Sequence, residues 1–173
     1  MKLFSFFLFI IVFSFSIYSA EIATFKLSYI IDNSLEFKKF FDKLDSLRTK
    51  LENELIEDEN ILISKKNKIE ESKMIFSETE YSQQIENYNK LASLFKGKLE
   101  DFNNHINMNI EKNKNILIDE IIKITKELSQ SNKIDIILNE DQYFLSSEEI
   151  DISDKIIEIL NKKQLDLKVI QLP

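Results

Sequence analysis

Acidic clusters and a single histidine are the residues of this chain whose types suit catalysis or metal binding. Residues 57–59 read Glu-Asp-Glu, residues 70–71 read Glu-Glu, and His105 is the only histidine. Paired carboxylates can act as general acid and base, and a histidine can bind a metal ion or carry a proton. The chain has no cysteine and one glycine, which excludes thiol chemistry, disulfides and a glycine-rich phosphate loop.

The spacing of these residues does not favour a catalytic site. We expect the acidic clusters to be solvated faces of helices with lysines nearby in the sequence. His105 lies in a polar stretch one residue before an apolar position, so we expect it to be solvated as well. No nucleophile, base and acid occur in a combination typical of an active site. The sequence therefore predicts a non-enzymatic protein with no cofactor and no bound metal.

The middle of the chain carries two long apolar stripes at helical spacing. Their steps are three, four or seven residues, which is typical of a coiled-coil seam. The stripes predict helices over 34–76 and 80–129 that fold back as an antiparallel hairpin with its turn near 77–79. Asn113 is the one interruption of the second stripe. The first stripe is Phe37, Phe41, Leu44, Leu51, Leu55, Leu62, Ile69 and Phe76, and the second runs from Tyr81 to Leu128.

Several apolar residues of the hairpin lie off this seam or at its turn. Such residues remain partly exposed on a two-helix hairpin, because only a narrow strip of each helix is covered. They fit two interpretations: scattered exposed side chains, which are normal on a soluble protein, or an adaptable surface for client proteins. The candidate client-binding residues are Ile61, Ile63, Met74, Ile75, Phe76, Leu94 and Met108.

The N-terminus has the three parts of a secretory signal peptide. Lys2 precedes an apolar or hydroxyl-bearing run over residues 3–17, and Ala20 ends the segment before the first acidic residue. We expect cleavage after Ala20 and export. The net charge is −7, and removal of residues 1–20 takes away one lysine to leave −8. An acidic protein of this kind is a poor candidate for binding nucleic acid.

The two ends of the mature chain predict a small β/α body (21–33 and 131–173) that carries the arm (34–130). We expect strands over 22–27, 134–138 and 142–145, the last two joined as a hairpin through 139–141. Asp151 should cap a last helix over 152–162, and Asn132 should end the second long helix in the left-handed conformation. So small a body cannot bury enough apolar surface alone, so we expect oligomerisation. Its candidate apolar residues are Ile22, Phe25, Leu27, Ile134, Ile136, Leu138, Tyr143 and Leu145.

Residues 134–160, IDIILNEDQYFLSSEEIDISDKIIEIL, carry the most specific pattern of the chain. A hydrophobic–Asp–hydrophobic strand, an aromatic-containing segment and an Asp-Ile-Ser start of an apolar helix resemble the C-terminal pattern of the Skp/OmpH family of periplasmic chaperones. The resemblance implies a mainly α fold: a homotrimer with a shared β body and three helical arms around a cavity. Such proteins act in the periplasm without ATP, holding unfolded outer-membrane or other exported proteins until delivery.

The charge of this chain departs from that family. Skp-type chaperones are typically basic, and their positive surface is associated with capture of clients and acidic lipid headgroups. Here the arm carries nearly equal numbers of basic and acidic residues, so we expect only weak association with a membrane surface. An alternative remains open at this point: a structural coiled-coil spacer or adaptor of the envelope, tethered by an uncleaved N-terminal segment.

Overall fold

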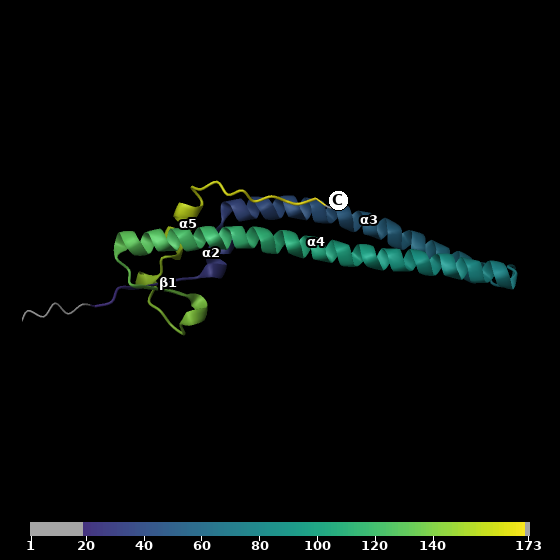
Figure 1. Ribbon diagram of the computed structural model, residues 1–173, viewed down its shortest axis with the longest axis horizontal. Coiled ribbons are helices and arrows are strands. Elements are labelled where there is room, and N and C mark those ends of the chain that lie inside the picture. Colours follow the sequence, from purple (N-terminus) through teal and green to yellow (C-terminus); the bar gives the residue numbers. More distant parts are fainter. Residues whose placement is uncertain (1–18, 172–173) are drawn as a thin grey trace, which may run out of the picture.

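The computed structural model describes residues 19–171. The predicted signal peptide therefore lies outside the described residues except for its last two positions. The molecule is elongated, with a long helical hairpin that projects from a small β/α base (Figure 1). Within the described part, no helix is both long enough and apolar enough to cross a membrane. The elements in chain order are β1 (Ile22–Phe25), α2 (Leu27–Asn33), α3 (Leu35–Ser72), α4 (Glu78–Asn132), β2 (Ile136–Asn139), the 3-10 helices η2 (Glu140–Gln142) and η3 (Glu148–Ile150), and α5 (Ser153–Leu160).

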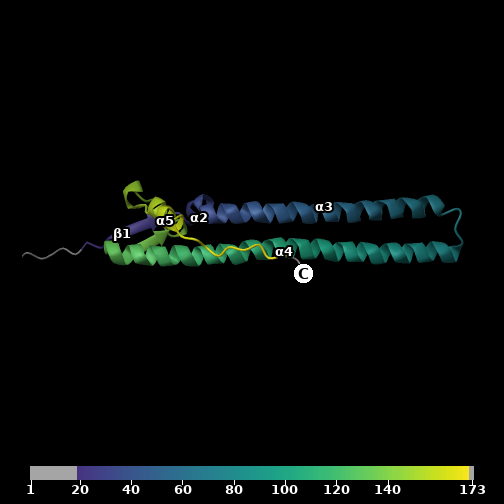
Figure 2. The same cartoon turned by 90° about the horizontal axis from the view of Figure 1, so that it is seen from above.

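Helices α3 and α4 form the hairpin that the apolar stripes predict. They have 38 and 55 residues, which correspond to about 57 and about 82 Å at the rise of an α-helix. They run antiparallel and side by side (Figure 2). The turn occupies residues 73–77, so the prediction of 77–79 was a few residues late. A capping box explains the difference, because Ser77 and Glu80 exchange backbone–side-chain hydrogen bonds and start α4 at Glu78.

Helix α3 starts after a short helix, α2, that the sequence analysis did not predict. The buried Ser34 separates the two helices, and its hydroxyl accepts a hydrogen bond from the Phe37 backbone N–H at 3.3 Å. Asn161 holds the same junction from the far end of the chain. Its amide donates to the Asn33 carbonyl at 3.2 Å and accepts from the Leu35 N–H at 2.8 Å. The break is therefore fixed by a contact that is remote in sequence.

The two ends of the chain meet in a parallel pair of strands, as the sequence analysis requires. Strand β1 pairs with β2, and Ile22 lies opposite Ile136. At the other edge of β1, the Thr24 carbonyl accepts a hydrogen bond from the Ile152 N–H at 2.8 Å. The predicted hairpin with a strand at 142–145 was wrong. After β2 the chain forms the 3-10 helix η2, in which Asn139 and Gln142 cap each other by hydrogen bonds. This turn directs the chain away from β2, so no antiparallel strand forms beside it within the described residues.

Helix α4 ends at Asn132, three residues beyond the predicted end, and the left-handed residue lies one position later than predicted. Lys133, with φ of 54°, takes the left-handed conformation that we expected of Asn132. The Asn132 side-chain amide donates to the Leu128 carbonyl at 2.9 Å. This bond keeps Asn132 in the last helical turn, and Lys133 takes the C-cap position.

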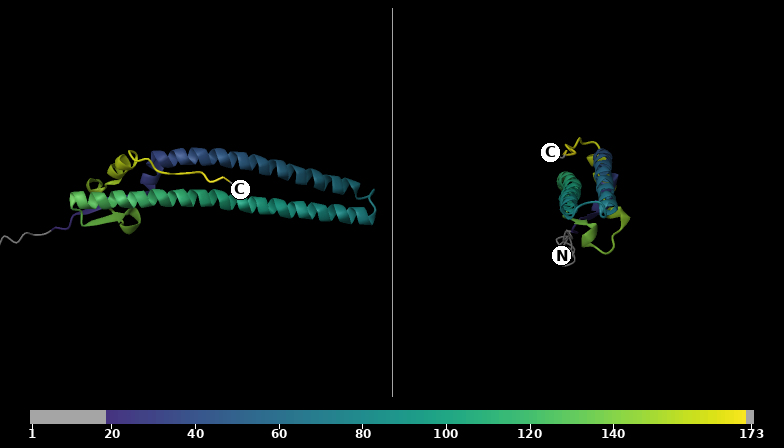
Figure 3. Two further views of the ribbon diagram at one scale, coloured as in Figure 1. Left: turned by 45° about the horizontal axis from the view of Figure 1, so that its top comes forward. Right: turned by 90° about the vertical axis from the view of Figure 1, so that its right-hand side faces the viewer.

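The hydrophobic core lies at the base and in the adjoining part of the hairpin. Phe40 is 2% exposed and stacks within 5.7 Å of Phe37, whereas the predicted stripe residue Phe41 is 41% exposed. The stripe shifts because α3 is covered here by more than α4 alone: a chain segment that follows α5 also packs on the core (Figure 3). The buried core cluster is Ile30, Phe37, Phe40, Leu44, Leu117, Ile121, Ile124, Leu128, Ile156 and Leu160.

Candidate functional site

The base is held by hydrogen bonds between the two ends of the chain. The Asp151 carboxylate accepts from the Ser153 N–H at 2.9 Å and from the Ser153 hydroxyl at 2.5 Å, and it forms an ion pair with Lys26 at 3.0 Å. Burial by itself would raise the pKa of Asp151, but the hydrogen bonds from Ser153 and Lys26 outweigh it and hold the pKa below its usual value. Asp151 thus joins the start of α5 to the end of β1.

The predicted apolar residues of the body do not form a closed core in the single chain. Ile22 and Ile136 are brought together by the strand register, yet both remain more than 40% exposed. Tyr143 is half-buried, and its hydroxyl has no hydrogen-bond partner among the described residues. Leu145 lies in the connection between η2 and η3 and is 85% exposed. The structure therefore leaves apolar surface at the base. Of the remaining candidates, Phe25, Leu27, Ile134 and Leu138 are half-buried.

The outer arm, which we define as residues 48–104, differs from the base in its burial. Within this fully described range, Ile69 is the only buried residue. The large apolar side chains that the sequence singled out are exposed, from 37% for Phe76 to 99% for Met74. They are spread along α3, the turn and α4 and do not converge on one pocket. These residues are Ile61, Ile63, Met74, Ile75, Phe76 and Leu94. Met108, which is also exposed, lies on α4 four residues closer to the base than the outer arm.

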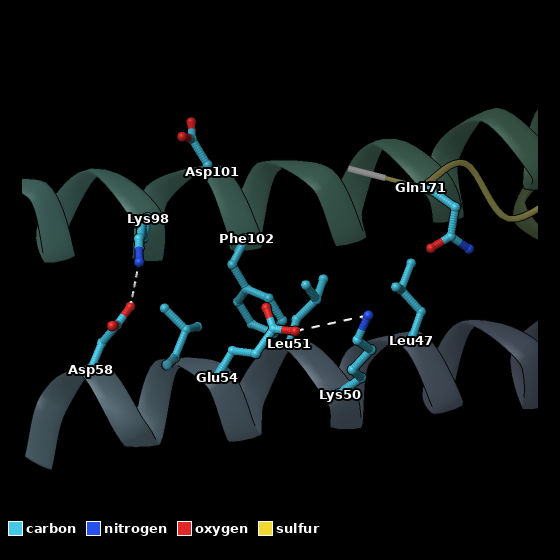
Figure 4. Close-up of a pocket in the computed structure, with 10 residues that line it drawn as sticks. Leu47, Lys50, Leu51, Glu54, Asp58, Lys98, Asp101, Phe102 and Gln171 are labelled. Atoms are coloured by element: carbon cyan, nitrogen blue, oxygen red, sulfur yellow. Dashed lines mark hydrogen bonds and ion pairs between the residues drawn. The ribbon is translucent and has the colours of Figure 1, made fainter. Parts of the chain in front are cut away.

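A groove between α3 and α4 opens where the outer arm begins (Figure 4). Its apolar wall includes Leu51 from α3 and Phe102 from α4, whose ring points toward α3 in the close-up. Gln171 lies at one end of the groove. At the other end, Lys98 and Asp58 form an ion pair at 2.5 Å that joins the two helices. Asp58 of the acidic cluster is thus paired across the hairpin.

The segment that follows α5, residues 161–171, is the tail. It has no helix or strand, and it runs from α5 along the hairpin in the direction of the tip (Figures 1 and 2). Lys163 anchors its start by an ion pair with Glu120 of α4 at 2.6 Å. The hydrogen bond from Lys163 lowers the pKa of Glu120, in spite of burial, and Lys123 acts in the same direction. From the sequence alone, these residues are expected only to form part of the body.

Three polar residues of α4 bind the tail, and we call them the polar ladder: His105, Asn109 and Asn113. All three are buried, with exposed fractions of 6% or less. Asn113 accepts from the Lys168 N–H at 2.9 Å and donates to the Lys168 carbonyl at 3.1 Å. Asn109 makes the same pair of bonds with Ile170, at 2.7 and 3.3 Å. The His105 Nε2 lies 2.7 Å from the Ile170 carbonyl oxygen, to which it donates.

The polar ladder corrects two interpretations of the sequence. His105 is buried against the tail, so the prediction of a solvated histidine was wrong. Asn113 interrupts the apolar stripe because its buried side-chain amide pairs with both the N–H and the C=O of Lys168. The available signal was the spacing of His105, Asn109 and Asn113 at four-residue intervals along one helix face.

The described residues offer no site for a metal ion. Within 19–171, no three His, Asp or Glu side chains lie close enough together to hold one. The polar ladder has every amide occupied by the tail or by its own helix. The amides of the polar ladder bind the backbone of the tail.

Comparisons with known proteins agree with this architecture. A family model described as "Outer membrane protein (OmpH-like)" matches residues 21–160. Among solved structures, a crystal structure of a protein from Caulobacter crescentus CB15, described as a "putative outer membrane chaperone (OmpH-like)", superposes with a TM-score of 0.72. It is 16% identical in sequence, and the match covers 84% of this chain and 86% of that chain, which shows the same fold. The search of curated proteins returned no match.

Proposed function

The chain belongs to the OmpH-like family, and on this basis we propose that it is an ATP-independent holdase chaperone of the periplasm. It binds unfolded outer-membrane proteins, or other exported proteins, between helical arms and prevents their aggregation. The observation that carries the proposal is the outer arm, which projects from the base and leaves its large apolar side chains exposed.

An arm of this kind suits a client without a fixed shape. Met74, Ile75 and Phe76 lie at the tip, where the chain has no regular structure, and Met and aromatic side chains adapt to different partners. Many weak apolar contacts can offset the tendency of a client to aggregate, and no single pocket is required. Since the charges of the arm are nearly balanced, apolar contacts contribute more to capture than electrostatic attraction does, and association with acidic lipid is weak.

We further propose that the base completes its core by forming a homotrimer. Two strands of four residues make a sheet too small to be stable by itself. Phe144 and Leu145 are highly exposed at the base, and Ile122 of α4, which is 58% exposed, lines a surface pocket with Phe25 and Ile137. The buried Tyr143 hydroxyl, unpaired among the described residues, would also gain a partner at such an interface.

Refolding of an outer-membrane β-barrel protein from denaturant in the presence of residues 21–173 tests the function. We expect a stoichiometric amount of trimer to suppress light scattering without ATP. Unchanged scattering with an intact trimer would contradict the holdase and favour the spacer or adaptor. Sedimentation equilibrium tests the assembly separately, and a stable monomer would contradict the shared base.

Two matched variants test whether the outer arm binds clients and whether the base forms the trimer. The triple variant Ile61→Ser/Ile63→Ser/Leu94→Ser removes exposed apolar side chains from the outer arm, so we expect weaker suppression with an unchanged trimer. The variant Phe144→Ser/Leu145→Ser removes apolar side chains that are more exposed still, at the base, so we expect weaker trimerisation first. If both variants weakened suppression and left the trimer intact, the base would be part of the client surface.

A further inference from the structure

The tail has the side-chain pattern of a half-buried β-strand. Leu165, Leu167 and Val169 pack against the hydrophobic core, while the intervening Asp166 and Lys168 are exposed. This alternation with a period of two requires an extended backbone. In an extended chain the backbone N–H and C=O groups of alternate residues point to the same edge. The N–H and C=O groups of Lys168 and Ile170 therefore lie along one edge of the tail.

The polar ladder matches the repeat of such an extended segment. Asn109 and Asn113 are four residues apart on α4, a rise of about 6 Å. Lys168 and Ile170 are two residues apart in the tail, a rise of about 6.6 Å. Each asparagine therefore meets one residue of the same edge and binds both its N–H and its C=O. Helix α4 presents asparagine amides where a neighbouring β-strand would present peptide groups.

This mode of binding does not depend on the side chains at Lys168 and Ile170. The hydrogen bonds of the ladder go only to their backbone atoms, while the alternate residues Leu165, Leu167 and Val169 pack on apolar surface. Recognition by backbone hydrogen bonds with apolar positions at alternate residues is the usual logic of strand addition. Any extended segment with the same alternation meets these requirements.

The groove does not end with the described tail. Gln171 lines a groove between α3 and α4 that reaches the ion pair of Asp58 and Lys98, and a second groove that shares this pair includes Ile61 and Leu94. The direction is the one in which the tail already runs (Figures 2 and 4). A longer extended segment seated on the ladder would therefore enter the outer arm, where exposed apolar residues lie.

We propose that the groove beside the polar ladder is a binding site for an extended client segment of alternating apolar and polar residues. The tail is its internal occupant, which the client displaces. The inference rests on the proposed holdase function and names the mode of binding. Strands of outer-membrane barrels have this alternation with a period of two, and an unfolded barrel offers many of them. The tail reproduces their pattern over residues 165–169.

The length of the client segment determines whether it can displace the tail. A tethered tail competes at an effective concentration on the order of millimolar, so a peptide that only copies it is a weak competitor. A longer segment gains the apolar surface beyond Gln171 in addition to the ladder. We therefore expect a 16-residue alternating peptide to displace the tail at a concentration at least about tenfold lower than an eight-residue copy.

The full-length mature chain provides a direct reporter of tail displacement, because it has neither tryptophan nor cysteine. Lys50 and Gln171 line the same groove. The variant Lys50→Trp/Gln171→Cys, labelled at residue 171 with bimane, should be quenched by the nearby indole while the tail is seated. We expect the 16-residue alternating peptide, and an unfolded outer-membrane barrel protein, to restore the emission.

Peptide controls separate the backbone from the side chains. A peptide of the same composition with the alternation scrambled should not restore the emission at the same concentration. N-methylation of the backbone amides on the ladder edge leaves every side chain in place and removes the donors, so we expect the required concentration to rise about tenfold or more. Equal potency of the methylated peptide would overturn the proposal.

Protein controls use asparagines of the same helix. In the labelled chain, Asn109→Ala/Asn113→Ala should raise the emission before any peptide is added, and far-UV circular dichroism checks that α4 is retained. The exposed pair Asn107→Ala/Asn115→Ala should leave the quenching unchanged. Absence of quenching in the parent reporter would overturn the seated tail.

Barrel-protein solubility and bimane emission together distinguish failure of the displaceable tail from failure of the holdase. If a barrel protein is kept soluble while the emission stays quenched, the holdase stands and the displaceable tail is overturned. If the peptide restores the emission while no barrel protein is kept soluble, the groove stands and the holdase fails.

Discussion

The inner and outer parts of the same hairpin are built on different principles. Near the base, α3 and α4 are covered by α5 and the tail, and side chains such as Ile121 and Ile124 are almost completely buried. Over residues 48–104 the helices pack mainly on each other, with Gln171 of the tail at the inner end of their groove, and Ile69 is the one buried residue in this described range. The comparison indicates that burial, and with it stability, is concentrated at the base, while the outer arm leaves large apolar side chains exposed.

The largest expected effect contrasts two isoleucines. Ile124 is fully buried near the base, whereas Ile61 is 54% exposed on the outer arm. We expect Ile124→Ala to lower the free energy of unfolding by about 2–5 kcal/mol, because it leaves a cavity in a packed core. Ile61→Ala should change it by less than about 0.5 kcal/mol. Urea unfolding followed by circular dichroism measures both, and equal losses would erase the distinction.

The second prediction concerns the contact between the tail and α4. Asn113→Ala leaves the N–H and C=O of Lys168 without their partner, so we expect a loss of about 1–3 kcal/mol in unfolding free energy. Hydrogen exchange at the Lys168 amide should accelerate. The exposed Asn115 on the same helix gives the control, since Asn115→Ala should affect neither quantity. Unchanged protection of Lys168 in Asn113→Ala would show that the tail is held by its apolar side chains alone.

The structure accounts for which of these features could be predicted from the sequence. The hairpin follows from local periodicity, because apolar residues three and four apart define a helix face without further knowledge. The polar ladder could not be predicted in this way. Asn113 looks like an interruption until the tail, more than fifty residues later in the chain, returns to bind it.

The base shows the same limit. The meeting of β1 and β2 was predicted, since neither strand can be stable alone. The strand expected at 142–145 was wrong, because the composition of these residues cannot reveal that Asn139 and Gln142 close a turn first. Helix α2 was missed because its boundary depends on Asn161. Burial at the base is set by contacts remote in sequence, whereas exposure on the outer arm follows from the seam.

A third, smaller effect tests the base through pH. The pKa of Asp151 is lowered in the folded chain, so its carboxylate stabilises the fold above the unfolded value near 3.9, and this contribution is lost as pH falls through the lower folded value. We expect Asp151→Asn to cost about 1 kcal/mol at pH 7, a modest value because the carboxylate is partly solvated. The difference from the parent should shrink below about pH 4. A pH-independent difference would contradict the role of the charge, and Asp119→Asn on exposed α4 is the control.

The smallest expected effect is on the unfolding free energy and comes from Gly97 on the outer arm. A Cβ added at Gly97 would meet no atom within 4 Å, so Gly97→Ala should raise the unfolding free energy by up to about 1 kcal/mol through helix propensity alone. Thermal unfolding of the purified chain measures it. A loss of stability would indicate that this side of α4 is covered by another subunit.

The central claim is that clients are bound by the outer arm and the groove that leads into it. Hydrogen exchange of the full mature chain, measured with and without an unfolded outer-membrane barrel protein, tests it most directly. We predict that the client slows exchange over residues 48–104 and leaves the core segment around Ile121 and Ile124 unchanged. Protection confined to the base, with residues 48–104 unaffected while the client is kept soluble, would contradict the account.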